Sequence, residues 1–270
     1  MKTRIISGVL MMPLLLFVWY GKTPLFCLCL ALALIGLHEF FKGLAVMGRR
    51  PASWIGYASV VALYAITYLF LFLRVLSAES YALAMNLWLF ATVAAALFVS
   101  LFRKDHDVFD GPLAALAALY IGYFSIHIVL TSENTSWIWL VFLSAFGTDT
   151  MAYFTGYFLG KHKLCPNLSP KKTVEGAVGG VLGSMLLCLL YGLLFEPSGA
   201  VYCAAAGLFA SPFAQAGDLI ASAFKRKMGI KDYGKLIPGH GGVMDRIDSV
   251  LLTAPVIYYV YSVFFTLLAG

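Results

Sequence analysis

Residues 24–41 read PLFCLCLALALIGLHEFF, and this apolar run decides the fold class. A helix crosses the hydrocarbon core of a membrane when it offers roughly 20 mostly apolar residues. Similar runs recur along the chain, separated by breaks that contain Gly and Pro. We predict nine transmembrane helices, over 5–20, 24–41, 54–76, 81–102, 112–131, 136–160, 174–195, 199–222 and 249–268. The expected fold class is an all-α integral membrane protein, a single polytopic domain over 1–270.

The composition agrees with this prediction. Hydrophobic residues make up 61% of the chain and charged residues only 12%, whereas a soluble domain carries roughly 25% charged residues. The formal net charge of +6 does not indicate a nucleic acid partner, because the basic residues lie between apolar runs, where they suit lipid headgroups. The five cysteines include no C-x-x-C pair and no zinc spacing.

Basic residues are distributed unevenly between the two sides that nine spans define. The side with the N-terminus carries 17 of the 19 Lys and Arg residues, and the other side carries only Lys22 and Arg74. Because cytoplasmic loops are rich in Lys and Arg, we expect a cytoplasmic N-terminus and an outside C-terminus. Lys2 and Arg4 precede 5–20 as in a signal peptide, but no small-x-small cleavage site follows, so we expect a retained first span.

Glycine pairs four residues apart predict close helix packing. They are Gly156 with Gly160, Gly176 with Gly180, and Gly179 with Gly183. This spacing lets helix backbones approach one another in lipid.

Acidic residues inside the apolar runs predict a functional site. An Asp at the centre of a membrane helix costs about 2.5–3.5 kcal/mol, so the surroundings must offset it. Asp149 lies within the sixth span, and Asp218 lies near the cytoplasmic end of the eighth. Glu39 and its neighbour His38 lie near the end of the second span, where pairing with Lys42 is the simpler interpretation.

The densest group of polar residues runs from 222 to 248. It contains SAFKR at 222–226, KDYG at 231–234, IPGHGG at 237–242 and DRID at 245–248. Asp218 and Ser222 are four residues apart and share one helix face, and Asp245 and Asp248 are three apart and share another. Two carboxylate-bearing helix ends at one aqueous interface make a site of oxygen ligands, which favours Mg²⁺.

The same loop suits a ligand that carries phosphate. The basic side chains available to phosphate oxygens are Lys225, Arg226, Lys231, Lys235 and Arg246. The glycines of 239–242 let backbone N–H groups approach a phosphate. A second basic loop on the same side, 169–176, contains Lys171 and Lys172. Ordinary positive-inside loops are the alternative interpretation, but the carboxylates beside 222–248 favour a site.

The motifs of protein nucleophiles are missing. The sequence has no G-x-S-x-G and no H-E-x-x-H. Phosphoryl or nucleotidyl transfer needs no such nucleophile, because positioning and electrostatic stabilisation by metals and basic residues do most of the catalysis.

Residues 222–248 resemble the signature of the phosphatidate cytidylyltransferase (CDP-diacylglycerol synthase) family, and every specified position is filled. The segments DTMAY at 149–153 and SPKKTVEG at 169–176 also resemble family segments. A mild departure is Gly147, where a more polar residue is expected. The N-terminal half resembles the family only in hydropathy and length, so we expect 1–135 to be mainly scaffold and 136–270 to carry the catalytic loops.

The resemblance implies a reaction and a set of roles. CTP and phosphatidate would give CDP-diacylglycerol and pyrophosphate, with Mg²⁺ and possibly a second cation. Metal ligands would be Asp218 and Asp245, helped by Asp248 and Asp149. Catalytic residues would be Asp218, Asp245, Lys225 and Arg246. Substrate would contact Lys171, Lys172, Ser222, Lys225, Arg226, Lys231, His240, Gly241, Gly242 and Arg246. The family also implies a homodimer in the bacterial inner membrane, active on its cytoplasmic face.

Other functions remain open on the sequence alone. An ion-coupled secondary transporter would use Asp149 and Asp218 as a relay. A polyprenol or phytol kinase would consume CTP but release CDP. A structural membrane subunit would show no turnover.

Overall fold

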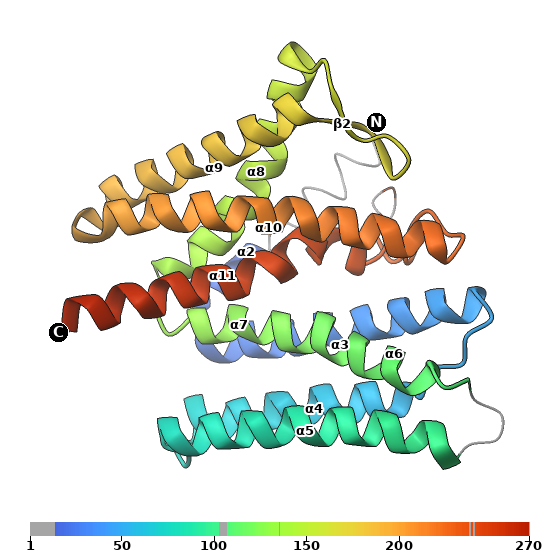
Figure 1. Ribbon diagram of the computed structural model, residues 1–270. Helices are drawn as coiled ribbons and strands as arrows, with labels where there is room; N and C mark the ends of the chain where they lie inside the picture. Colours follow the sequence, from blue (N-terminus) through green and yellow to red (C-terminus); the bar gives the residue numbers. More distant parts are fainter. Residues whose placement is uncertain (1–13, 103–106, 135, 238, 240, 270) are drawn as a thin grey trace.

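The computed structural model describes residues 14–102, 107–134, 136–237, 239 and 241–269, and within them the fold is a bundle of long helices (Figure 1). The helices are α2 (Leu14–Tyr20), α3 (Lys22–Val46), α4 (Ser53–Leu71), α5 (Ala78–Phe102), α6 (Asp110–Ala117), α7 (Phe124–Thr131), α8 (Trp137–Leu159), α9 (Val174–Phe195), α10 (Ala200–Lys227) and α11 (Met244–Ala269). A π-helical segment, η1 (Ala118–Tyr123), joins α6 to α7, and a 3₁₀ turn, η2 (Pro197–Gly199), precedes α10. The predicted helical fold class is confirmed.

Six helical segments of the described residues are long and apolar enough to cross a membrane. They are Lys22–Val46, Ser53–Leu71, Ala78–Val99, Asp110–Thr131, Val174–Phe195 and Met244–Phe264. The predicted spans 136–160 and 199–222 form the long helices α8 and α10, which are not among these six. Of the predicted span 5–20, only α2 lies within the described residues. The chain is therefore an integral membrane protein with several candidate spans, and nine spans remain a prediction.

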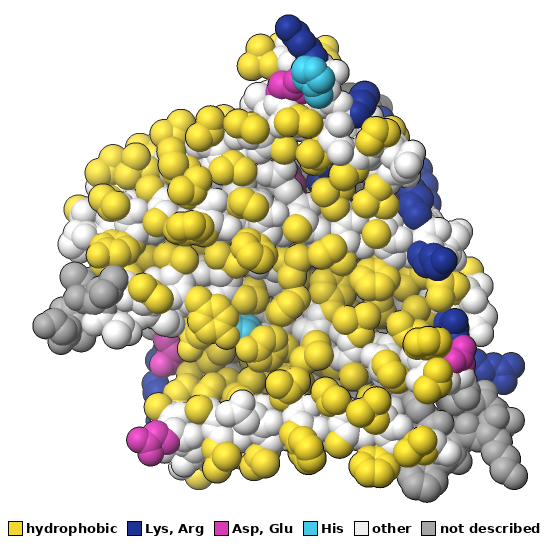
Figure 2. All heavy atoms as spheres, in the orientation of Figure 1, with side chains coloured by type: hydrophobic (Ala, Val, Ile, Leu, Met, Phe, Trp, Pro, Cys, Tyr) yellow, Lys and Arg dark blue, Asp and Glu magenta, His cyan; other side chains and the backbone are white. Residues whose placement is uncertain are grey.

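The surface has the two zones expected of a membrane protein. Hydrophobic side chains cover most of the face in Figure 2, and Lys and Arg side chains gather along one edge. Large apolar side chains such as Phe90, Leu101 and Val201 are at least 73% exposed, as suits contact with lipid rather than water.

Small residues bring α8 and α9 together, as the glycine pairs predicted. A β-carbon at Gly176 would lie 2.7 Å from the backbone oxygen of Ala152 and 3.1 Å from the Cα of Gly156. Most of the other helices run side by side in Figure 1, and α8 is steeply inclined to them. The tilted α8 carries Asp149 toward α10 and α11, which both pack against it.

The second basic loop contains a short β-hairpin that the all-α prediction lacked. Strand β1 (Lys163–Cys165) pairs antiparallel with β2 (Ser169–Thr173), with Lys163 opposite Thr173. The Thr173 hydroxyl caps α9 by accepting the Gly176 N–H at 3.1 Å. The Glu175 carboxylate accepts the backbone N–H groups of Lys161 and His162. The hairpin is thereby fixed to the start of α9, which holds its lysines beside α8.

Candidate active site

A close approach of α10 and α11 forms the floor of the site. A β-carbon at Gly217 would collide with the backbone oxygen of Asp248 and would lie 3.1 Å from the Cα of Ser249. Only glycine at 217 permits this spacing. The contact sets Asp218, the next residue of α10, beside Asp248 of α11.

Three carboxylates from three helices come into electrostatic reach of one another here. Asp149 of α8 and Asp248 of α11 each lie within electrostatic reach of Asp218 and of one another. Asp248 is 7% exposed, and its Oδ1 accepts the N–H of Ser249 at 2.8 Å. The Ser249 side chain lies near Asp149 and favours its charged form. We call Asp149, Asp218 and Asp248 the carboxylate cluster.

Basic side chains face the cluster. Lys172 Nζ lies 2.5 Å from Asp218 Oδ2. Arg246 is exposed and lies within electrostatic reach of Asp149. The cluster thus collects negative charge that cations partly balance, and the same cations can bind a phosphate.

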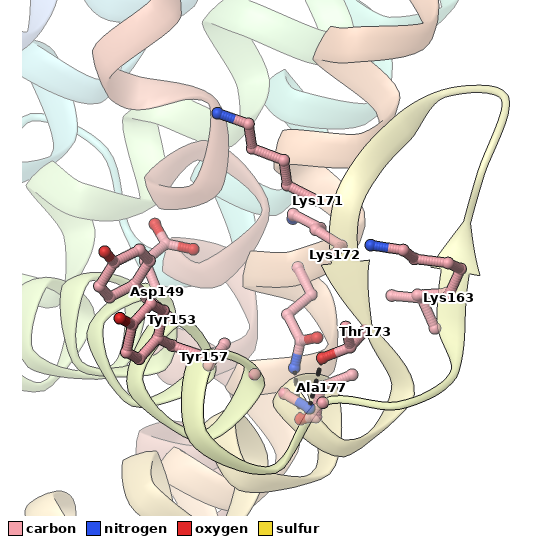
Figure 3. Close-up of a pocket in the computed structure, with 14 residues that line it drawn as sticks. Asp149, Tyr153, Tyr157, Lys163, Lys171, Lys172, Thr173 and Ala177 are labelled. Atoms are coloured by element: carbon pink, nitrogen blue, oxygen red, sulfur yellow. Dashed lines mark hydrogen bonds between the residues drawn. The ribbon is translucent and has the colours of Figure 1, made fainter.

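A pocket of about 480 Å³ opens beside the cluster, between α8, α9 and the hairpin (Figure 3). Asp149 and Tyr153 lie on one wall, and lysines from both strands of the hairpin lie on the other. The lysines that line it are Lys163, Lys171 and Lys172. Gln215 completes the lining, and its Nε2 donates to the backbone oxygen of Ala177 at 3.1 Å.

Asp245 has a different environment from the cluster. Its Oδ1 lies 2.7 Å from Lys225 Nζ. Its Oδ2 accepts the N–H groups of Tyr233 at 2.8 Å and Gly242 at 2.9 Å. Both oxygens are therefore engaged, which favours a structural role; a metal-ligand role for Asp245 stays a prediction.

The signature loop closes tightly around Asp245. Gly241 has a φ of +87°, which favours glycine, and its backbone bridges to Ile237. Burial, aided by the nearby Tyr120, raises the pKa of Tyr233 well above its usual range. This phenol therefore stays neutral, and it donates to the backbone oxygen of Ala221 at 3.2 Å.

Glu39 of α3 caps the start of α11, a role that the sequence did not reveal. Its carboxylate accepts the N–H of Val243 at 3.1 Å and that of Met244 at 2.9 Å. Negative charge at a helix N-terminus is favourable, because free N–H groups point outward there. A β-carbon at Gly234 or Gly242 would collide with this carboxylate. The structure thus shows a helix cap in place of the ion pair with Lys42 that seemed simpler.

The remaining predicted residues border this region or lie outside the described residues. Ser222 is half-buried on α10, and Arg226 and Lys231 are exposed beyond it. His240 lies outside the described residues. Three residues near the site have no distinctive signal in the sequence, because each is a lone polar residue beside a loop or on a helix: Lys163, Gln215 and Ser249.

The donor set of the cluster suits a hard divalent cation. All its donors are carboxylate oxygens, and they project from three separate helices. Across the part of the chain that the structure describes, no group of three or more His, Cys, Asp or Glu side chains is already converged as a metal site. The cluster therefore offers ligands within electrostatic reach of one another rather than a finished coordination sphere.

Long apolar helices around a site of carboxylates and lysines define the class: a membrane-embedded enzyme that acts on phosphate-bearing substrates. The chain belongs to the cytidylyltransferase family, whose sequence pattern matches residues 2–264.

Its relatives specify the class. A phosphatidate cytidylyltransferase of Bacillus subtilis (strain 168) is 34% identical over 271 residues, which cover 98% of this chain and 98% of the relative. The enzyme of the same name from Staphylococcus haemolyticus is 30% identical over 94% of this chain and 95% of the relative. That of Staphylococcus aureus (strain COL) is 36% identical over 59% of this chain and 62% of the relative. These matches confirm the predicted resemblance and the predicted enzyme, a nucleotidyltransferase of phospholipid synthesis.

Proposed function

We propose that the carboxylate cluster and the lysines of the hairpin form the centre at which CTP and phosphatidate give CDP-diacylglycerol and pyrophosphate. The observation that carries this assignment is that Asp149, Asp218 and Asp248 lie within electrostatic reach of one another, with Lys172 bound to Asp218. An oxygen of the lipid phosphate attacks the α-phosphorus of CTP, the bond from that phosphorus to the bridging oxygen of the β-phosphate breaks, and pyrophosphate leaves with the electron pair. No protein nucleophile is required.

Location supports the assignment. Phosphatidate stays in the leaflet and CTP stays in water, so their reaction belongs at a membrane interface. Lys and Arg side chains gather along one edge of the molecule (Figure 2). By the positive-inside rule this edge faces the cytoplasm, which in a bacterium is the inner side of the inner membrane. The C-terminus then lies outside.

Each basic residue has a task that follows from its partner. Lys172 is bound to Asp218 and can exchange this carboxylate for a substrate phosphate. Lys163 and Lys171 extend the positive wall of the same pocket, and Arg246 adds charge near Asp149. Lys225 acts mainly through Asp245, whose hydrogen bonds fix the loop. Further substrate contacts are assigned to Ser222, Arg226, Lys231, His240, Gly241 and Gly242.

The cofactor is Mg²⁺, held by Asp218 and Asp248 with help from Asp149. Bound Mg²⁺ would neutralise phosphate charge and polarise the α-phosphoryl group. A metal-ligand role for Asp245 remains part of the proposal. A second cation and a homodimer are also part of it. Together these ligands bring an anionic nucleotide to an anionic lipid, which repel each other without such neutralisation.

A product assay tests the function. The full-length chain in detergent is given phosphatidate, Mg²⁺ and CTP labelled in its α-phosphate. Label in the organic phase with equal release of pyrophosphate supports the proposal. Labelled CDP in the aqueous phase indicates a lipid kinase instead, and no CTP-dependent turnover contradicts both. Glu133→Gln is a suitable control, because Glu133 contacts Arg74 and Lys22, the two basic residues placed away from the site.

A further inference from the structure

A π-helical turn interrupts the helix that runs from α6 to α7. This segment, η1, contains Ala118–Tyr123 and packs against α3 and α4. A β-carbon at Gly36 would lie 3.3 Å from Ile121 Cγ2 and 3.7 Å from Met244 Sδ, so η1 lies near the start of α11. Wide turns of this kind are rare and are frequent at functional sites. The residues of this turn are therefore candidates for a functional role.

Tyr120 of η1 has a buried hydroxyl that makes no hydrogen bond. Its side chain is only 6% exposed. Within the described residues, two buried side-chain polar atoms lack a partner: the Tyr120 hydroxyl and Trp137 Nε1. An unpaired buried hydroxyl costs about 1–3 kcal/mol. A phenylalanine would avoid this cost and leave the packing unchanged.

Aromatic side chains fix the Tyr120 ring in place. Its centroid lies 6.3 Å from that of Phe40, 6.1 Å from that of Phe224 and 6.3 Å from that of Phe124. Tyr233 belongs to the same group through Phe40, but its hydroxyl is satisfied by Ala221. The position of the unpaired hydroxyl is therefore set by packing.

The Tyr120 side chain lies near two members of the carboxylate cluster. Asp248 and Asp218 are both within electrostatic reach. A phenol is a neutral donor, so it adds a positive dipole to the cluster without adding charge. Phosphate oxygens brought to the cluster are strong acceptors for such a donor.

We propose that the Tyr120 hydroxyl donates a hydrogen bond to a phosphate oxygen of a substrate held at the carboxylate cluster. Tyr120 is then a substrate-binding residue supplied by the N-terminal half of the chain. The phosphate belongs either to the nucleotide or to the lipid, which share this chemistry. The inference rests on the proposed function.

The experiment compares Tyr120→Phe with Tyr64→Phe in the full-length enzyme. Tyr64 is equally buried, at 1% exposed, but its hydroxyl bonds to Ser125 Oγ at 2.9 Å. We expect Tyr120→Phe to lower kcat/KM by about 10–100-fold, the range of a hydrogen bond to a charged group, with Tm unchanged or higher. Tyr64→Phe should lower Tm by about 2–4 °C and keep kcat/KM within about twofold.

The outcomes separate the possibilities. A raised KM for CTP in Tyr120→Phe assigns the bond to the nucleotide, and a raised KM for phosphatidate assigns it to the lipid. A loss in kcat alone assigns it to the transition state. The inference is overturned if Tyr120→Phe keeps wild-type kcat and both KM values, or if its loss of activity follows a fall in Tm. Wild-type enzyme that makes no CDP-lipid would instead reject the proposed function.

Discussion

Asp245 and Asp248 lie one turn apart at the start of α11 and are equally buried, at 8% and 7% exposed, yet their surroundings differ. Asp245 accepts hydrogen bonds from Lys225 and from two backbone N–H groups. Asp248 accepts one N–H from its own helix and lies within electrostatic reach of Asp218, Lys225 and Asp149, with no ion pair of its own among the described residues. One carboxylate is fully paired, and the other has two carboxylates and only one lysine within electrostatic reach.

This difference divides the signature sequence into two working parts. The part around Asp245, with Lys225 and the Glu39 cap, satisfies its charges internally and holds the loop. The carboxylate cluster leaves negative charge only partly balanced, which costs stability in a low dielectric. A protein keeps such an arrangement where function requires it.

The largest effect is expected from Asp218→Asn. It removes a proposed metal ligand, so CDP-lipid formation should fall by about 10³-fold, or about 4 kcal/mol. The change also reduces like-charge repulsion with Asp149 and Asp248, which offsets the loss of the partly exposed ion pair with Lys172, so Tm should change little. Activity within about tenfold of wild type would contradict the assignment of the catalytic role to the carboxylate cluster rather than to Asp245. Glu133→Gln serves as the control.

The next largest effect is expected from Asp245→Asn, and it has the opposite pattern, because the main loss should be in stability. Lys225 would lose its partner while only 13% of its side chain is exposed, at a cost of about 3 kcal/mol. Thermal and denaturant unfolding should report the loss. A variant that is stable but inactive would instead place Asp245 with the metal ligands, as the sequence analysis expected.

A smaller effect is expected in the part around Asp245, where a double-mutant cycle tests the contact between Glu39 and Gly242. Glu39→Ala removes the cap and should cost about 1–2 kcal/mol. Gly242→Ala should be damaging alone, because its methyl group meets the Glu39 carboxylate. In the double variant the methyl group has space, so the combined loss of stability should be at least 1 kcal/mol less than additive, roughly the scale for residues in contact. Additive losses would show that the two residues act independently.

The smallest effect is expected from Lys163→Ala. Lys163 lines the pocket but is solvent-exposed, so loss of an exposed charge contact of about 0.2–1 kcal/mol should raise KM by no more than about fivefold. The matched control is Lys161→Ala, which removes an exposed lysine near the hairpin that does not line the pocket. Equal changes in both variants would point to general surface charge.

Hydropathy located the helices well, because apolar length follows directly from bilayer thickness. It misplaced the start of α11, expected at 249 and found at Met244, because the polar first turn resembles a loop. That turn is helical because Glu39, far away in sequence, caps it. The hairpin and η1 were missed for a similar reason: their shapes depend on contacts such as Gly122 against Val60, which leave no periodic signal.

The sequence predicted that the acidic residues of the motif lie in one region of the fold, and their catalytic and metal-binding roles stay predictions. The motif brought Asp218, Asp245 and Asp248 to one region because their spacing and the loop between them allow it. The different surroundings of Asp245 and Asp248 arise from backbone N–H donors and from Asp149 on another helix. Backbone donors have no sequence identity, and Tyr120 resembled any aromatic residue of a membrane helix.

The Glu39 cap also constrains how this sequence can change over evolutionary time. Positions 39, 234 and 242 fill a single small volume, in which one carboxylate is accommodated only while both partners lack a side chain. A drift to alanine at either glycine therefore requires a shorter residue at 39 in the same lineage. Position 39 lies about two hundred positions before the two glycines, yet all three sites are expected to covary as one unit of selection.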